Sequence, residues 1–168
     1  MVENQKEHGE HNAAIKARSV LAQTFVHHLD QQQAICDVLE SIADSLPANV
    51  DVQVCNHVGQ TLLPLIVKAH QFEESQLFPF LSNSEHFQFE LAQTIKRLRA
   101  EHLSDEDYAE DICRVFAGEI KNLDRSQAES LGWMLRGFFE NVRRHVSLER
   151  EHILPMIETN LTKPTMQR

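Results

Sequence analysis

Residues that interrupt helices are scarce in this chain, and that scarcity limits its fold more than any other feature. Only five glycines and five prolines occur among its 168 residues, which favours long helices over many short strands. Four segments repeat apolar residues at the three- and four-residue spacings of an amphipathic helix. They cover about 13–46, 51–81, 82–118 and 126–155, and an end of the third at 123 is the alternative. We predict an all-α protein, an antiparallel up-down four-helix bundle with short connections.

The length fits one domain, which we place at residues 13–160. Residues 1–12 are expected to form a flexible N-terminal arm and residues 161–168 a flexible tail. Capping boxes at 82–85 and 126–129 predict the starts of the third and fourth helices. Pro64, inside the second segment, predicts either a kink or the start of its regular part.

Charge and composition exclude several classes of partner. The net charge of -9, with histidine neutral, argues against binding to nucleic acid. No run of eighteen apolar residues is present to span a membrane, and the N-terminus lacks the basic start and apolar run of a secretory signal. The three cysteines are an odd number without C-x-x-C spacing. We expect a cytoplasmic protein with reduced, mostly buried thiols and with neither nucleic acid nor a membrane as a partner.

Histidine is unusually frequent, with ten residues, and two of them precede a glutamate on the second and fourth helices. His70 and Glu74 are four residues apart, as are His145 and Glu149. Side chains at this spacing lie on one face of a helix, so each pair can approach a common point in the core. A mixture of imidazole and carboxylate suits iron or manganese, whereas a structural zinc site normally uses thiolate.

The other two helices supply one histidine each at the same depth, His28 and His102. About eighteen residues separate His28 from the end of its helix, and about nineteen separate His70 from the start of the next. His102 and His145 stand at about the same two distances from the turn between the third and fourth helices. At about 1.5 Å per residue, these runs bring the four histidines to one level. His27 is the alternative to His28, which the apolar residues at +7, +10 and +11 favour.

The order His, His-x-x-x-Glu, His, His-x-x-x-Glu resembles the hemerythrin-like HHE cation-binding family, and most closely its di-iron repair-of-iron-centres (Ric) proteins. The runs Leu77-Phe78-Pro79 and Ile153-Leu154-Pro155 and the pair Glu101-His102 strengthen the likeness, which covers about residues 13–157. The resemblance implies two iron ions joined by an oxo or hydroxo bridge. It also implies their ligands: His28, His70, His102 and His145 at the ends, with Glu74 and Glu149 bridging.

One departure from the family pattern leaves the carboxylate of the second helix open. The bridging glutamate usually stands six residues before a proline, as Glu149 does before Pro155, whereas Glu74 is five residues before Pro79. Glu73 is therefore the alternative to Glu74. Glu106, four residues after His102, is expected to face solvent or to support a ligand from outside.

The resemblance implies a non-haem di-iron protein that reacts with or senses O2, NO or peroxide during oxidative or nitrosative stress, and that aids the repair of iron centres. The alternative is a non-catalytic oxygen or iron carrier or a sensor module, so whether the protein is an enzyme stays open. The expected partners are a small diatomic or peroxide ligand and, for repair, a client iron–sulfur or redox protein. Monomer and dimer are both compatible with the sequence.

Overall fold

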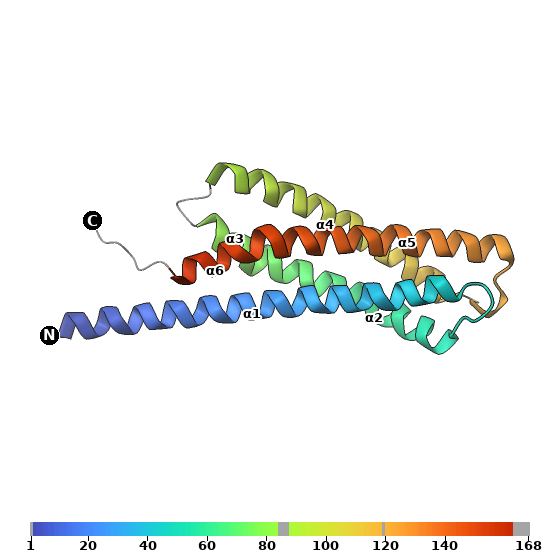
Figure 1. Cartoon of the computed structure of the whole chain (residues 1–168), viewed down its shortest axis with the longest axis horizontal. Helices are drawn as coiled ribbons and strands as arrows, with labels where there is room; N and C mark the ends of the chain where they lie inside the picture. The colour runs from blue at the N-terminus through green and yellow to red at the C-terminus, as the bar shows by residue number, and fades with distance from the viewer. Residues whose placement is uncertain (1, 84–87, 119, 163–168) are drawn as a thin grey trace.

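The computed structural model of the protein describes residues 2–83, 88–118 and 120–162, with side chains described for 12–83, 91–118, 120 and 122–158. Four long helical arms run alternately in opposite directions (Figure 1). The first is α1 (Val2–Ser45). The second joins α2 (Val52–Phe72), the π-helical turn η1 (Glu73–Leu77) and α3 (Phe78–Ser82). We call such a π-helical turn a wide turn. The predicted all-α four-helix bundle is confirmed.

The fourth arm repeats the plan of the second, and the third arm is simpler. The third is α4 (Gln88–Phe116), followed by the short 3-10 turn η2 (Ile120–Asn122). The fourth joins α5 (Arg125–Leu148), the wide turn η3 (Glu149–Ile153) and α6 (Leu154–Thr162). Wide turns therefore interrupt the second and fourth arms, which are the arms that carry the predicted His-x-x-x-Glu pairs.

Aspartates form the caps at two of the helix starts. The Asp51 carboxylate accepts hydrogen bonds from the backbone N–H groups of Gln53 and Val54, at 2.9 and 3.2 Å. Asp124 and Gln127 form a reciprocal capping box at the start of α5. The predicted box at 126–129 is therefore wrong by two residues, because the Asp124 side chain already accepts the hydrogen bond from the backbone N–H of Gln127. The predicted box at 82–85 extends into residues outside the described ranges.

The helices differ from the expected ones in two further places. α1 begins at Val2, so most of the expected N-terminal arm is helical and continuous with the first arm (Figure 1). α2 continues through Pro64 without a break. Most of the expected tail, residues 163–168, lies outside the described residues.

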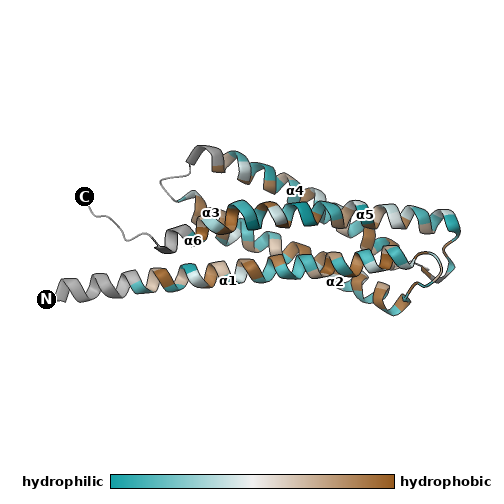
Figure 2. Cartoon of the chain, in the orientation of Figure 1, coloured by the Kyte–Doolittle hydropathy of each residue, from teal (hydrophilic) through white to brown (hydrophobic). Residues whose placement is uncertain are grey.

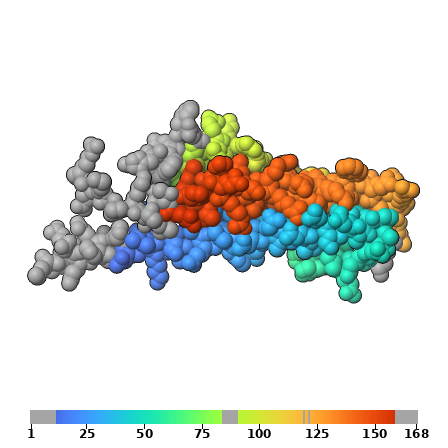
Figure 3. All heavy atoms as spheres, viewed as in Figure 1, coloured from blue at the N-terminus to red at the C-terminus, as the bar shows by residue number. Residues whose placement is uncertain are grey.

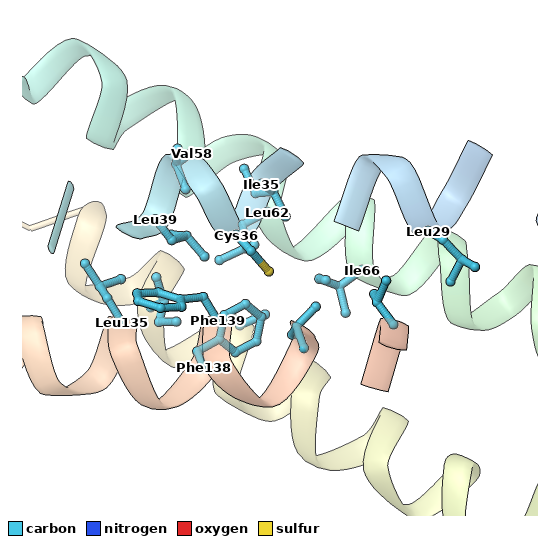
Figure 4. Packing of buried hydrophobic residues seen from close by; sticks show 14 of the residues in the cluster. Leu29, Ile35, Cys36, Leu39, Val58, Leu62, Ile66, Leu135, Phe138 and Phe139 are labelled. Carbon is cyan, nitrogen blue, oxygen red and sulfur yellow. The ribbon is translucent and has the colours of Figure 1, made fainter. Parts of the chain in front are cut away.

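The inward faces of the arms form one apolar core. Hydrophobic and hydrophilic residues alternate around each helix, as amphipathic packing requires (Figure 2). Figure 4 shows Cys36 of α1 packed among side chains such as Leu39, Leu62 and Phe139. Each large apolar side chain that is fully buried contributes about 1.5–3 kcal/mol. The three cysteines are free, two of them buried and Cys113 half-buried, as predicted.

Surface ion pairs join α1 to the fourth arm, and Figure 3 shows these two arms lying together along one face. Arg143 contacts both Asp37 and Glu40 at 2.7 Å. Arg150 contacts Asp30 at 2.5 Å. Exposed pairs of this kind contribute little individually, about 0–1 kcal/mol, so the core supplies most of the stability. Within the described part of the chain, no helix has both the length and the apolar character needed to cross a membrane.

Candidate metal centre

Four buried side chains from three arms converge in the bundle interior. Each offers one ligand atom, and these atoms all lie within 4.8 Å of one another. The two histidines come from α4 and α5, and the two glutamates are the first residues of the wide turns η1 and η3. We call this set the inner cluster: Glu73, His102, His145 and Glu149.

The inner cluster has many polar atoms that no hydrogen bond satisfies. Both carboxylate oxygens of Glu73 and of Glu149, and the Nε2 atoms of His102 and His145, are buried without a partner among the described residues. His102 Nε2 lies 2.9 Å from Glu73 Oε2, and His145 Nε2 lies 3.4 Å from Glu149 Oε2. Neither contact has hydrogen-bond geometry. Buried charges without partners are costly, at several kcal/mol, and a bound cation removes this cost. The donor set therefore fits a metal ion.

The pKa values in the cluster follow from burial and from the crowding of like charges. Burial and the neighbouring Glu149 raise the pKa of Glu73 to about 8. Burial alone would lower the pKa of His145, but the carboxylates of Glu149, Glu73 and Glu101 together outweigh burial and raise that pKa to about 9. Without a cation, protons would have to balance these carboxylates.

Three histidines have a carboxylate partner on their outer nitrogen, Nδ1. The distances are 2.9 Å from His70 to Glu106, 3.1 Å from His102 to Glu74 and 3.1 Å from His145 to Glu101. An ionised carboxylate only accepts hydrogen bonds, so in each pair Nδ1 donates its proton. When the imidazole is neutral, as metal binding requires, the lone pair is then on Nε2, which in His102 and His145 is the atom that faces the inner cluster. This arrangement is typical of histidines that bind metals.

Two of these bonds are exchanged between helices. His70 and Glu74, four residues apart, come from the second arm, and His102 and Glu106, also four apart, come from α4. Each histidine bonds to the glutamate of the other pair. The two imidazole rings stack with centroids 3.9 Å apart and planes 8° apart. Each helix therefore holds a histidine of the other in a fixed orientation.

The structure places His70 beside His102 of the inner cluster and His28 beside Phe72, and neither is among the four members of the cluster. His28 is buried whereas His27 is exposed, so His28 is the histidine of α1 that faces the interior. The His28 ring lies 5.1 Å from that of Phe72, the residue before Glu73. Burial and the neighbouring His102 and His145 lower the pKa of His70 to about 2, so its imidazole is neutral.

Glu74 is not where we expected it. Its side chain is 44% exposed and lies on the outer side of His102, whereas the side chain of Glu73 is fully buried in the inner cluster. Glu73 belongs to the buried stripe that continues through Leu77 and Leu81, and Glu74 is turned about 100° away from it. We predicted that Glu74 faces the core, and the structure corrects this: Glu73 faces the core instead. Glu73 stands six residues before Pro79.

Sequence reasoning noted the pair Glu101-His102 only as part of the family resemblance, gave Glu101 no role and left the role of Glu106 open. Glu101 adjoins His102 in sequence but bonds to His145 on another helix, and it also contacts Arg97 at 2.6 Å. The His-x-x-x-Glu spacing marked Glu106, although only the fold shows that its partner is His70. No sequence signal identifies Glu101, because its partner is distant along the chain.

Comparison with known proteins gives one family. The family model described as "Hemerythrin HHE cation binding domain" matches residues 21–157. That range contains all the histidines and glutamates discussed above. No curated protein and no solved structure matches the chain.

Proposed function

Because the chain belongs to the hemerythrin HHE cation-binding domain family, and is a metal-binding hemerythrin-like protein, we propose that its inner cluster is part of a non-haem di-iron centre. We further propose that this centre reacts with or senses O2, NO or peroxide. The observation that supports the proposal most strongly is the set of buried, unpartnered ligand atoms: four carboxylate oxygens and two imidazole nitrogens.

The proposed ligands are the four histidines identified from the sequence together with Glu73 and Glu149. His102 and His145 would hold one iron, and His28 and His70 the other, with the two carboxylates shared between them. Support for the first pair is the 4.8 Å limit that encloses both histidines and both glutamates. Support for the second is the burial of His28 and His70 and the stacking of His70 on His102. Nitrogen and carboxylate oxygen together suit iron.

The protein would contribute orientation and the exclusion of water. Glu74, Glu101 and Glu106 each hold an imidazole with its Nδ1 protonated, which leaves the opposite nitrogen free for a metal. Apolar residues such as Phe78, a buried ring whose centroid lies 5.8 Å from that of His102, pack against the cluster. An iron pair, when bound, supplies redox-active metal with open positions for a small ligand.

The finer likeness to the repair-of-iron-centres proteins stays a prediction that the spacing of histidines and glutamates supports. A role in iron-centre repair would need a client iron–sulfur or redox protein as partner. A carrier or sensor would hold the same ligands without turnover. Loss of iron to a client apoprotein, monitored in the mixture, separates repair from the other two roles.

The test of the proposed function is metal content together with absorption. Protein expressed with added iron should contain about two irons per chain and absorb in the near ultraviolet and visible. Consumption of NO or peroxide, lost in His70→Ala and His145→Ala, would support a reactive centre over a carrier. Colourless wild-type protein without metal would contradict the proposal.

A further inference from the structure

A polar layer lies one helical turn from the histidines. Its members stand three or four residues from a histidine on their own helix, and so on the same face. α1 and α4 run in one direction and α5 in the other (Figure 1), which brings the members to one level. That level is on the opposite side of the histidines from the two inner glutamates. We call this set the polar layer: Gln32 on α1, Asp105 on α4 and Asn141 on α5.

Electrostatic neighbours agree with this position. His145 interacts electrostatically with the carboxyl group of Asp105, and Asp105 in turn interacts electrostatically with the thiol of Cys36. Cys36 lies one turn beyond Gln32 on α1, packed among the apolar side chains that Figure 4 shows. The polar layer therefore lies between the histidines and the apolar core.

Gln32 has unused hydrogen-bonding capacity in this layer. Its side chain is only 1% exposed, and its amide nitrogen has no hydrogen-bond partner among the described residues. Asp105, by contrast, accepts a hydrogen bond of 2.6 Å from the amide of Asn141. Burial raises the pKa of Asp105. A buried N–H donor without an acceptor destabilises a folded protein, unless a ligand or water occupies the place of the acceptor.

We infer that the Gln32 amide donates a hydrogen bond to a small anion held at the metal centre. The apolar core closes the far side of the polar layer, so the acceptor would approach from the histidine side. A metal ion and an N–H donor facing one space together favour an acceptor that carries negative charge. This inference rests on the proposed function, because the anion is held in part by the metal.

The test uses iron-loaded protein titrated with azide, followed by the absorption that azide produces on binding ferric iron. Gln32→Met keeps the length of the side chain and removes the amide, and Gln32→Leu serves as a second apolar variant. We expect both to retain wild-type iron content and to bind azide about tenfold more weakly. The matched control is Gln31→Leu, which makes the same chemical change at a residue that lines the groove between α1 and α2. It should bind azide as the wild type does.

Stability of the metal-free protein gives a second readout. Because Gln32→Met removes an unsatisfied buried donor, its melting temperature without metal should equal or exceed that of the wild type. A structural role for Gln32 would instead lower it. Weaker azide binding with undiminished stability supports the inference.

Any one of three results would overturn this inference without contradicting the proposed function. They are unchanged azide affinity in both Gln32 variants, an equal loss in Gln31→Leu, and loss of iron or of metal-free stability in both Gln32 variants. Unchanged affinity would mean that Gln32 bonds only to a buried water. Wild-type protein without iron would instead contradict the proposed function itself, and the two failures are thus distinguished.

Discussion

Glu73 and Glu74 are adjacent in sequence but lie in opposite surroundings. Glu73 is buried with both oxygens unpartnered, and Glu74 is near the surface with one oxygen on His102 Nδ1. At this scale the sequence identified the chemistry but not which of the two glutamates faces inward. Spacing from His70 favoured Glu74, because an ideal α-helix brings residues four apart together. Spacing from Pro79 favoured Glu73, and that spacing agrees with the fold.

The pair offers a matched comparison. Glu73→Gln should lower iron content from about two per chain to below one, because a neutral amide replaces a shared anionic ligand. Glu74→Gln should still reach about two irons at saturation, with affinity reduced about 10- to 100-fold, since it only orients His102. Iron analysis and competition with a chelator measure the two effects. Equal iron loss in both variants would show that the two glutamates do not have different roles.

The wide turns are the least predictable elements of this bundle. In each, an N–H bonds to a carbonyl five residues back, Phe78 to Glu73 and Leu154 to Glu149. A proline follows one residue later in both arms and cannot donate the next bond. Buried residues then recur every four positions, as in Glu73, Leu77 and Leu81, where a regular α-helix would drift. The sequence signal for a wide turn is a glutamate six residues before a proline, and it occurs in both arms. Helical spacing alone did not reveal that a wide turn is the cause of this pattern.

The contact between α2 and α4 at Gly59 gives a prediction about packing. A Cβ added at Gly59 would lie 3.0 Å from Cβ of Phe116, an atom fixed to its backbone. Gly59→Ala should therefore destabilise the protein by about 1–3 kcal/mol in chemical denaturation. Gly137→Ala is the control, because its new Cβ would meet only the hydroxyl end of Tyr108 at 2.8 Å, which can move. Alanine there should be neutral or stabilising by up to about 1 kcal/mol. A smaller loss at Gly59 than at Gly137 would contradict the helix contact described here.

For the whole molecule, the sequence predicted the fold class, the order of the four arms and the common depth of the histidines. Those features follow from helical periodicity and from the lengths of the segments, which are local quantities. The outer carboxylates depend on how α2, α4 and α5 pack, so a single sequence does not reveal them. The exchanged partners of His70 and His102 are the clearest case.

Stability without metal should depend on pH in a defined way. The native pKa values of Glu73 and His145, about 8 and about 9, exceed their ordinary values of 4.5 and 6.5. The native state therefore keeps a proton on Glu73 from about pH 4.5 to 8 and one on His145 from about pH 6.5 to 9 that the unfolded state has lost. Across each window stability falls by up to about 1.4 kcal/mol per pH unit for each proton. The lowered pKa values of His28 and His70 act oppositely below about pH 6.5. Metal-free protein should thus melt highest near pH 6.5–7, and a melting temperature that rises steadily to pH 9 would contradict these shifts.

Removal of metal should itself lower the melting temperature. Metal binds the native cluster and not the unfolded chain, so its binding free energy adds to stability. The difference between loaded and metal-free protein should widen from pH 7 to 9, because the ligands bind metal in their deprotonated forms. Calorimetry before and after exhaustive chelation measures the difference. An unchanged melting temperature after complete removal would count against an internal site.

Anomalous diffraction at the iron edge, from crystals of iron-loaded protein, tests the central claim most directly. We predict two iron peaks inside the bundle, both contacted by Glu73 and Glu149, one also by His102 and His145 and the other by His28 and His70. Glu74 should remain bonded to His102 Nδ1. A single peak, no peak, or iron bound by Glu74 in place of Glu73 would contradict the account.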